Sequence, residues 1–262
     1  MAPIYTSKGF AVGGATRRCS IDPVRSASDY IAGLAGKTFW LKANAGVVYD
    51  GSNRISSWTD QSSYGAVFQP ITGVGTDHAL RVASAYNGLD TVRFDGTTSR
   101  MLSTANLDPF QGSTSMTTYI VLKQGSTGAG NGCFFNDYDG VGTTRLSFQR
   151  NGAGNVYLHT NDTVNAADAN AVVTENTLTQ VAVVRNGTTT HKAYTKGVLQ
   201  ATDSTPGNIA MLAKKMGLGC QGSLGSLLWT GDLCELLIFN SAHDAATQAA
   251  VESALASKWA IA

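Results

Sequence analysis

The sequence predicts an all-β protein folded as a two-sheet antiparallel sandwich or jelly roll, with a short helix at its C-terminal end. Short apolar stretches recur along the chain and are separated by Gly, Asn and Asp turn signals, which is typical of such folds. The 262 residues include 29 Gly, and only 14% are charged, against about 25% in an ordinary soluble domain. A helical pattern follows the last predicted strand.

The first 36 residues differ from the rest of the chain. They show no sustained hydrophobic period, and one amphipathic piece, SASDYIAGLAG, is expected to form a helical turn or two. Strand signals begin at Lys37. We therefore predict an N-terminal arm over residues 1–36 and one globular domain over residues 37–262.

The arm is predicted to contact another chain. It contains too little apolar surface to form a core, yet more than a freely mobile tail would carry. It also holds three Arg and no Glu, so it could pair with acidic groups on a neighbour. The residues expected to take part in this assembly are Arg17, Arg18, Cys19 and Arg25.

The first predicted strands lie between residues 38 and 58. Phe39 and Leu41 alternate with more polar neighbours, as in a half-buried strand. The segment GVVYDGSNRISSW predicts a hairpin, because Asp50-Gly51 is a strong turn dipeptide. A further strand, TVRFDG, places Val92 and Phe94 on one face.

The later strands follow the same logic. TTYIVLKQG is a continuous apolar run, as expected for a strand buried on both faces. Hairpins are predicted over residues 145–160 and 179–200, the latter turning at Asn186-Gly187 and again at Lys196-Gly197. In the last strand, GDLCELLIFN, simple alternation places Leu233, Leu237 and Phe239 on one face.

The predicted helix lies at the C-terminal end. Val251, Leu255 and Trp259 recur every four residues, so they form an apolar stripe that should pack on the sandwich. Ser241, with Asp244 three residues later, resembles a capping box.

The stretch SSWTDQSSYG has two interpretations. If residues 55–58 end a strand, Trp58 is a core anchor and the polar residues from Asp60 to Ser63 form a turn bonded by their side chains. In the alternative, the indole is exposed and stacks on a sugar. We favour the core position.

Composition excludes several function classes. The net charge of +1 gives no electrostatic case for nucleic acid or an anionic membrane. No apolar run approaches the ~20 residues of a membrane span.

The four cysteines form no C-x-x-C pair and are expected to be buried free thiols. The N-terminus is a poor signal peptide, so we expect retention in the cytoplasm or delivery by another route.

No catalytic pattern stands out. A glycosidase needs two carboxylates flanking the bond, about 5–5.5 Å apart for retention. None of the three Glu residues, Glu175, Glu235 and Glu252, has an acidic residue two positions away, and Glu235 is expected to be a buried, hydrogen-bonded carboxylate. The sequence has no G-x-S-x-G elbow and no H-E-x-x-H motif, and its four His are far apart. We therefore predict a protein that is not an enzyme.

Four segments, in this order, resemble one family. FWLKANAGVVYDGSNRISSWTDQSSYG, NGLDTVRFDG, VAVVRNGTTTHKAYTKGVLQ and GDLCELLIFNSAHDAATQAAVESALASKWAI are similar to concanavalin A-like (laminin G-like) jelly-roll domains of the bacterial and bacteriophage type. The resemblance covers roughly residues 37–262. It implies two packed antiparallel sheets, one of them concave, but no single activity, since the fold hosts lectins, carbohydrate-binding modules, adhesive spacers and hydrolases.

The segment FFNDYDGVG is the candidate ligand site. Asn136, Asp137, Tyr138 and Asp139 could bind a glycan, with the tyrosine ring stacked on a sugar. Asp137 and Asp139 are also a calcium candidate, because laminin G-like domains often carry calcium at a loop rim; no other cofactor or metal is expected. The segment lacks the distant Glu of an EF-hand, and an Asp-rich turn explains it equally well.

The favoured function is that of a bacteriophage virion component, either structural or adhesive: a head decoration, a fibre or a tail protein. The arm would anchor it and the jelly roll would face outward. Expected partners are other virion proteins, copies of itself in a homo-oligomer, and cell-surface glycans. The alternative is a lectin-like, carbohydrate-binding module of a bacterial protein, outside the cell or on its surface.

Overall fold

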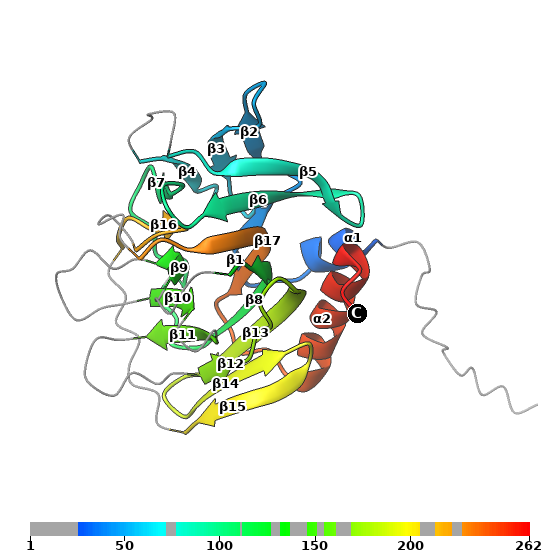
Figure 1. The fold of residues 1–262 in the computed structure, drawn as a ribbon. Coiled ribbons are helices and arrows are strands. Elements are labelled where there is room, and N and C mark those ends of the chain that lie inside the picture. The colour runs from blue at the N-terminus through cyan, green and yellow to red at the C-terminus, as the bar shows by residue number, and fades with distance from the viewer. Residues whose placement is uncertain are drawn as a thin grey trace, which may run out of the picture.

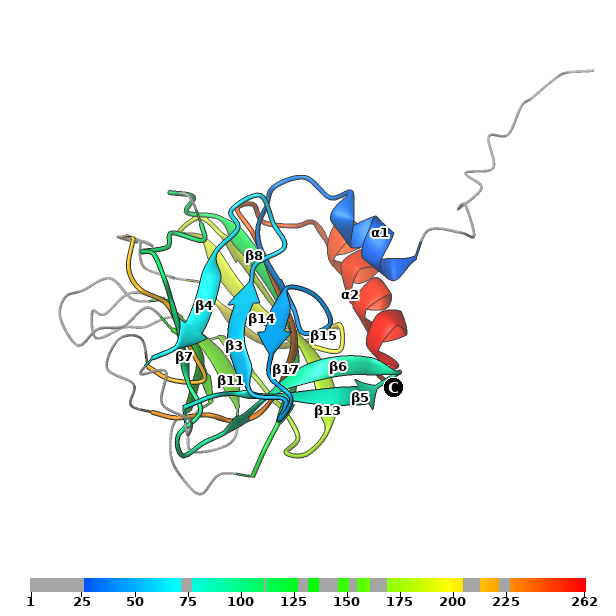
Figure 2. The ribbon, with the colours of Figure 1, turned by 90° about the horizontal axis from the view of Figure 1, so that it is seen from above.

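A computed structural model describes residues 26–71, 77–110, 112–126, 132–136, 146–150, 155–160, 169–204, 213–221 and 227–262. Within these ranges the chain forms two antiparallel sheets packed face to face, with two helices on the outer side of one of them (Figures 1 and 2). The predicted fold class, an all-β two-sheet sandwich with a C-terminal helix, is confirmed.

Sheet A contains eight strands among the described residues, in the order β15-β14-β13-β8-β17-β6-β5, with β1 paired to β17. The strand at its centre, β17, pairs with β8 on one side, and with β6 and then β1 on the other. The bounds are β1 (Lys37–Lys42), β5 (Leu80–Tyr86), β6 (Leu89–Asp95), β8 (Met116–Gln124), β13 (Leu178–Asn186), β14 (Thr190–Thr195), β15 (Val198–Asp203) and β17 (Thr230–Phe239).

Sheet B contains nine strands in the described part of the chain, in the order β12-β11-β10-β9-β16-β7-β4-β3-β2. Its strands are short, and neighbours in space are often far apart in sequence. The bounds are β2 (Val47–Tyr49), β3 (Ile55–Thr59), β4 (Val67–Pro70), β7 (Met101–Ser103), β9 (Gly132–Asn136), β10 (Leu146–Arg150), β11 (Val156–Thr160), β12 (Ala169–Ala171) and β16 (Gly217–Leu218).

The core fills the space between the two sheets. The ring of Phe39 on sheet A lies 6.0 Å from that of Phe68 and 5.3 Å from that of Phe135, both on sheet B. All three side chains are fully buried. Each such side chain contributes roughly 1.5–3 kcal/mol by leaving water, so clusters of this kind hold the sheets together.

The predicted hairpins are present. Strands β2 and β3 flank the Asp50-Gly51 turn, and β10 pairs with β11. Strand β13 turns into β14 at Asn186-Gly187, and β14 turns into β15 at Lys196-Gly197. Lys196 and Gly197 both have positive φ, 48° and 75°, as a tight two-residue hairpin turn requires.

The predicted face of β17 is wrong at one position. A β-bulge lies between Leu233 and Glu235, where Cys234 is the extra residue. A bulge reverses the alternation of side chains beyond it. Leu233 therefore points toward sheet B, whereas Leu237 and Phe239 point toward the outer face of sheet A.

Trp58 is a core anchor, as favoured from the sequence. Its side chain is fully buried, and its indole Nε1 donates to the carbonyl of Lys42 at 3.1 Å. The turn that follows is bonded by side chains. Asp60 accepts from the backbone N–H of Trp40 at 2.6 Å and from the hydroxyl of Ser62, also at 2.6 Å.

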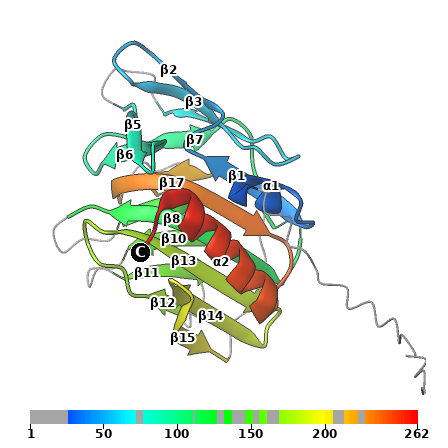
Figure 3. The same ribbon diagram turned by 90° about the vertical axis from the view of Figure 1, so that its right-hand side faces the viewer.

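Helix α2 (Ala245–Trp259) crosses the outer face of sheet A (Figure 3). The predicted stripe is confirmed, because Val251, Leu255 and Trp259 are all fully buried. The predicted cap at Ser241 is wrong. Asp244 is the N-cap, and its carboxylate accepts from the backbone N–H of Thr247 at 2.7 Å. The helix therefore begins three residues later than the capping pattern indicated.

Glu235 joins this helix to sheet A. Its carboxylate is fully buried and accepts from Trp40 Nε1 at 2.6 Å, from Lys258 Nζ at 2.7 Å and from Trp259 Nε1 at 2.7 Å. Two of these three donors lie on the last turn of α2. The prediction of a buried, satisfied carboxylate is confirmed, and its partners give it a structural role.

Part of the predicted arm packs on the domain. Helix α1 (Ala27–Ala32) begins at a capping box formed by Ser26 and Asp29, and it lies against α2 (Figure 2). Ile31 is fully buried and belongs to the hydrophobic core. Residues 1–25 lie outside the described residues, and so do the proposed assembly residues Arg17, Arg18, Cys19 and Arg25. The boundary at Lys37 stays a prediction.

Three cysteines, Cys133, Cys220 and Cys234, are buried free thiols, as predicted. Burial raises the pKa of the Cys220 thiol to about 12, so this sulfur stays protonated at neutral pH. Cys19 lies outside the described residues. Among the described residues, neither helix is long and apolar enough to cross a bilayer.

Candidate functional site

The structure describes only one residue of the site predicted from the sequence. Asn136 ends strand β9 and is fully buried. Asp137, Tyr138 and Asp139 lie outside the described residues, so the glycan site and the calcium candidate stay predictions. Within the described ranges, no group of three or more His, Cys, Asp or Glu side chains is arranged to hold a metal ion.

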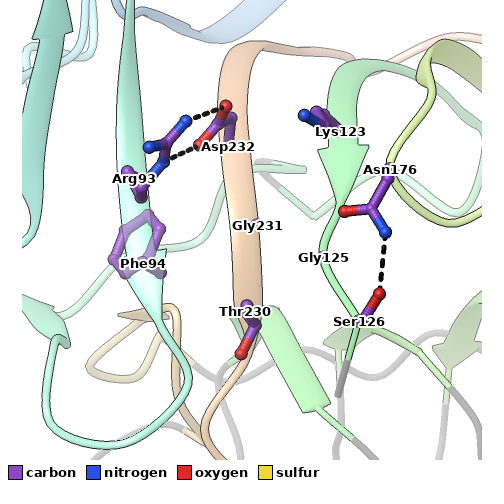
Figure 4. Close-up of a pocket in the computed structure, with 9 residues that line it drawn as sticks. All are labelled: Arg93, Phe94, Lys123, Gly125, Ser126, Asn176, Thr230, Gly231 and Asp232. Atoms are coloured by element: carbon purple, nitrogen blue, oxygen red, sulfur yellow. Dashed lines mark hydrogen bonds and ion pairs between the residues drawn. The ribbon is translucent and has the colours of Figure 1, made fainter.

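A different site is a hollow of about 270 Å³ at one end of the central strands of sheet A (Figure 4). Three charged side chains gather there, one each from β6, β17 and β8. Arg93, Asp232 and Lys123 lie side by side because Asp232 pairs across the sheet with both of the others. The lining residues are Arg93, Phe94, Lys123, Gly125, Ser126, Asn176, Thr230, Gly231 and Asp232.

Arg93 and Asp232 form a two-point ion pair across one wall of this pocket. The guanidinium Nε lies 2.6 Å from Oδ1 of Asp232, and Nη2 lies 2.9 Å from Oδ2. The carboxylate is 3% exposed, whereas the arginine side chain is 48% exposed. Arg93 has more N–H donors than the carboxylate uses, so N–H groups of a pocket-lining residue are left for a ligand.

Tyr86 supports this pair from the side. Its hydroxyl donates to Oδ2 of Asp232 at 2.9 Å. Burial and the neighbouring charge of Asp232 raise the pKa of Tyr86 far above its ordinary value, so the hydroxyl keeps its proton. The hydrogen bond to Asp232 likewise raises the pKa of Arg93. The carboxylate therefore has strong donors on both sides, and its orientation is held.

The opposite wall is polar and uncharged. Asn176 donates from Nδ2 to the hydroxyl oxygen of Ser126 at 2.7 Å, and its backbone N–H donates to the carbonyl of Gln124 at 2.7 Å. Its φ of 58° lies in the left-handed region that Asn tolerates better than most residues. This bonding leaves the amide oxygen of Asn176 as an acceptor and the hydroxyl of Ser126 as a donor.

Two glycines let the backbone approach closely at the floor. A Cβ on Gly231 would lie 2.4 Å from the Trp229 ring and 2.5 Å from the carbonyl of Lys123. A Cβ on Gly125 would lie 2.5 Å from the methyl group of Thr230. Trp229 is itself fully buried, and its Nε1 donates to Gln124 Oε1 at 2.7 Å. The floor is therefore rigid.

The turn after β6 is also held rigidly. Asp95 accepts from the backbone N–H groups of Thr97, Thr98 and Ser99 at 2.8, 2.8 and 2.9 Å. Burial acts to raise the pKa of Asp95, but these donors outweigh it and hold the pKa well below its usual range. Asp95 thus stays ionised, with its charge directed into its own turn.

This chemistry suits binding more than bond cleavage. Asp232 is the single carboxylate among the lining residues described, and Arg93 holds both of its oxygens. A two-carboxylate glycosidase needs a second acid about 5–5.5 Å away for retention. The pocket instead combines donors and acceptors of both charge signs on a fixed backbone.

Sequence reasoning missed this pocket. Arg93, Lys123 and Asp232 are charged residues within predicted strands, and these charges were the signal that the sequence offered. The sequence could not show that these residues lie together, because Lys123 and Asp232 become neighbours only when β8 pairs with β17.

Several solved structures resemble this fold. The binding domain of Paraclostridial Mosquitocidal Protein 1 aligns with a TM-score of 0.60 at 14% identity, covering 85% of this chain and 52% of that one. The botulinum neurotoxin serotype D binding domain aligns with a TM-score of 0.59 at 12% identity, covering 84% and 51%. This chain thus spans about half the length of those toxin domains.

A third structure matches over nearly its whole length. It is Domain 4 of AbnA, a GH43 extracellular arabinanase from Geobacillus stearothermophilus, in complex with arabinotriose. The TM-score is 0.60 at 14% identity, and the alignment covers 82% of this chain and 98% of that one. At such identities the likeness shows the fold alone.

Sequence comparison identifies the family. Among curated proteins no sequence matches this chain. Residues 94–247, more than half of the chain, match the Laminin_G_3 family, described as the Concanavalin A-like lectin/glucanases superfamily. The two-sheet sandwich, the terminal helix and this match agree, and the chain belongs to the laminin G-like family of the concanavalin A-like lectin/glucanase superfamily.

Proposed function

We propose that this chain is a non-enzymatic adhesive domain that binds a glycan in the pocket between Arg93, Asp232 and Asn176. The observation that carries the proposal is the convergence of fixed donors and acceptors on one hollow. Arg93 offers N–H groups, and Asn176 offers its amide oxygen from the opposite wall. A sugar presents neighbouring hydroxyl groups, each both donor and acceptor, which such a mixed set can match.

The size of the pocket agrees with a small polar ligand. Its volume of about 270 Å³ lies just below the range for sites that hold drug-sized molecules, roughly 300–1,000 Å³. The pocket therefore suits one terminal sugar, with the remainder of the glycan extending into solvent.

Two structural relatives support a binding role. The arabinanase domain was solved with arabinotriose, and the binding domain of Botulinum Neurotoxin DC was solved with SialylT. Two observations support the proposal that the chain is not an enzyme. Asp232, the one acid among the described lining residues, has hydrogen bonds to both carboxylate oxygens, and Glu235 has a structural role.

The proposed setting is a bacteriophage particle. Here the domain would be a decoration, fibre or tail component that assembles with copies of itself or with other virion proteins through its N-terminal arm. Support comes from the composition of the arm, residues 1–36, whose three Arg residues all lie before residue 26, and from the resemblance to domains of the bacterial and bacteriophage type. The test is assembly: light scattering should give a larger mass for the full chain than for a chain lacking residues 1–25. Equal masses for the two chains would show that the arm takes no part in assembly.

Glycan binding is tested with a matched pair of arginine variants. Arg93→Ala removes the pocket donor, whereas Arg81→Ala removes the arginine of a similar ion pair, with Asp90, outside the pocket. Hits from a glycan array are titrated calorimetrically against both variants. We expect Arg93→Ala to weaken binding at least about tenfold, the value of one charge-assisted hydrogen bond, and Arg81→Ala to leave it unchanged. No hit on the array, or equal affinities for the two variants, would refute the proposal.

A further inference from the structure

We propose that this pocket selects an acidic sugar, one that carries a carboxylate or sulfate group, and that Lys123 recognises the acidic group. This inference rests on the proposed glycan-binding function and names the ligand class of the same site. It starts from the charges that the strands bring together.

Lys123 is a cation without a partner in the described part of the chain. It lies directly opposite Asp232 in the pairing of β8 with β17. That carboxylate is already engaged by Arg93 through two hydrogen bonds and by the hydroxyl of Tyr86. No ion pair or hydrogen bond joins the side chain of Lys123 to another described residue, although this side chain lines the pocket and is half-buried. Figure 4 shows its amine beside the Arg93–Asp232 pair, with no interaction drawn to it.

The acidic residues near Lys123 already have other hydrogen-bond or ion-pair partners. Asp95, at the end of β6, directs its oxygens to the N–H groups of its own turn. Glu175, next to Asn176, pairs with Arg150 at 2.6 Å. Among the described lining residues the charged ones are Arg93, Lys123 and Asp232, and together they carry one net positive charge.

An anionic group on the ligand would balance this charge. A half-buried ammonium interacts with a carboxylate more strongly than an exposed one, because less water screens the pair. Charge-assisted hydrogen bonds are also roughly twice as strong as neutral ones. Asn176 and Ser126 would meanwhile bind ring hydroxyls on the opposite wall. The combination distinguishes an acidic sugar from a neutral sugar and from a small inorganic anion.

The experiment compares sugars that differ only in their acidic group. The full chain is titrated calorimetrically with glucose and glucuronic acid, galactose and galacturonic acid, galactose 6-sulfate, and sodium sulfate alone. We expect the acidic sugars to bind about tenfold more tightly than their neutral partners, with the difference shrinking as salt rises from about 50 mM to about 500 mM. Comparison of the sugar acids with galactose 6-sulfate shows which anionic group is preferred.

Lys123→Gln tests the residue itself. This variant keeps a polar side chain but removes the charge, so the preference for acidic sugars should disappear while affinity for the neutral partner stays the same. Lys192→Gln, on β14 and outside this pocket, is the control and should keep the preference. Thermal melting confirms that both variants fold.

The outcomes separate the two proposals. If neutral and acidic sugars bind equally, or Lys123→Gln keeps the preference, the inference fails while glycan binding stands. If sulfate alone binds as tightly as the acidic sugars, the pocket is an anion site and the inference fails. If no sugar binds, the proposed function fails as well.

Discussion

Glu235 provides the sharpest test of how this fold is held together. Replacing it by Gln preserves the shape of the side chain but removes its charge. One carboxylate oxygen accepts from Trp40, and the other accepts from both Lys258 and Trp259. An amide has a single acceptor oxygen, so its NH₂ group must face at least one of these donors. Lys258, whose side chain is 6% exposed, also loses its counter-charge.

The magnitude follows from this burial. Removing one partner of a buried ion pair costs about 3–5 kcal/mol, because the remaining charge has neither water nor a partner. For a chain of this size, that loss lowers the melting temperature by roughly 10 °C. The expected free-energy loss for Glu235→Gln is therefore several times that of Asp50→Asn. The latter also replaces a paired carboxylate by an amide, but Asp50 is 46% exposed and its partner Arg54 is 44% exposed, so water screens this pair and the loss should be small.

The assay is urea unfolding followed by circular dichroism and tryptophan fluorescence. Lys258→Met and the double variant complete a thermodynamic cycle. The double variant should lose less stability than the two single variants together, because it leaves no unpaired buried charge. Hydrogen exchange should show faster opening of α2 in Glu235→Gln. A loss below about 1 kcal/mol, or a cycle without coupling, would refute the view that this carboxylate pins the helix.

Three further predictions concern pH, the arm and calcium. Burial lowers the pKa of His243, whose Nδ1 lies 2.8 Å from the Tyr119 hydroxyl. Below the ordinary pKa of 6.5 the unfolded chain therefore binds more protons than the folded chain. Stability should decrease as the pH is lowered, until the folded pKa is passed. His243→Gln should reduce that slope between about pH 7 and pH 5, and an unchanged slope would exclude this residue as its source. At a concentration low enough to keep the chain monomeric, deleting residues 1–25 should leave the melting temperature unchanged. Deleting residues 1–36 removes buried Ile31 as well and should cost about 2–5 kcal/mol. Equal melting curves for the two deletions would place α1 outside the core. Adding a chelator should not change the melting curve, and a drop that Asp137→Ala with Asp139→Ala abolishes would instead establish a calcium site.

The local elements could be predicted from the sequence. Turn dipeptides such as Asp50-Gly51 and Asn186-Gly187 mark hairpins because few residues tolerate the backbone angles that such turns need. The stripe of Val251, Leu255 and Trp259 predicts its buried face because helical geometry places residues four apart on one side. These features depend on short stretches of chain, and the structure confirms them.

The tertiary structure alone decided the features that depend on distant pairing. The bulge at Cys234 reverses the alternation in β17, and no periodicity within that strand reveals it. Glu235 finds donors nearly 200 residues earlier in the chain, at Trp40, and on the terminal helix. The pocket likewise exists only where Arg93 and Lys123 meet Asp232 across three strands. Sequence patterns report the preferences of neighbouring residues, whereas the positions of charges in a sheet follow from strand order and register, which the packing of the whole chain sets.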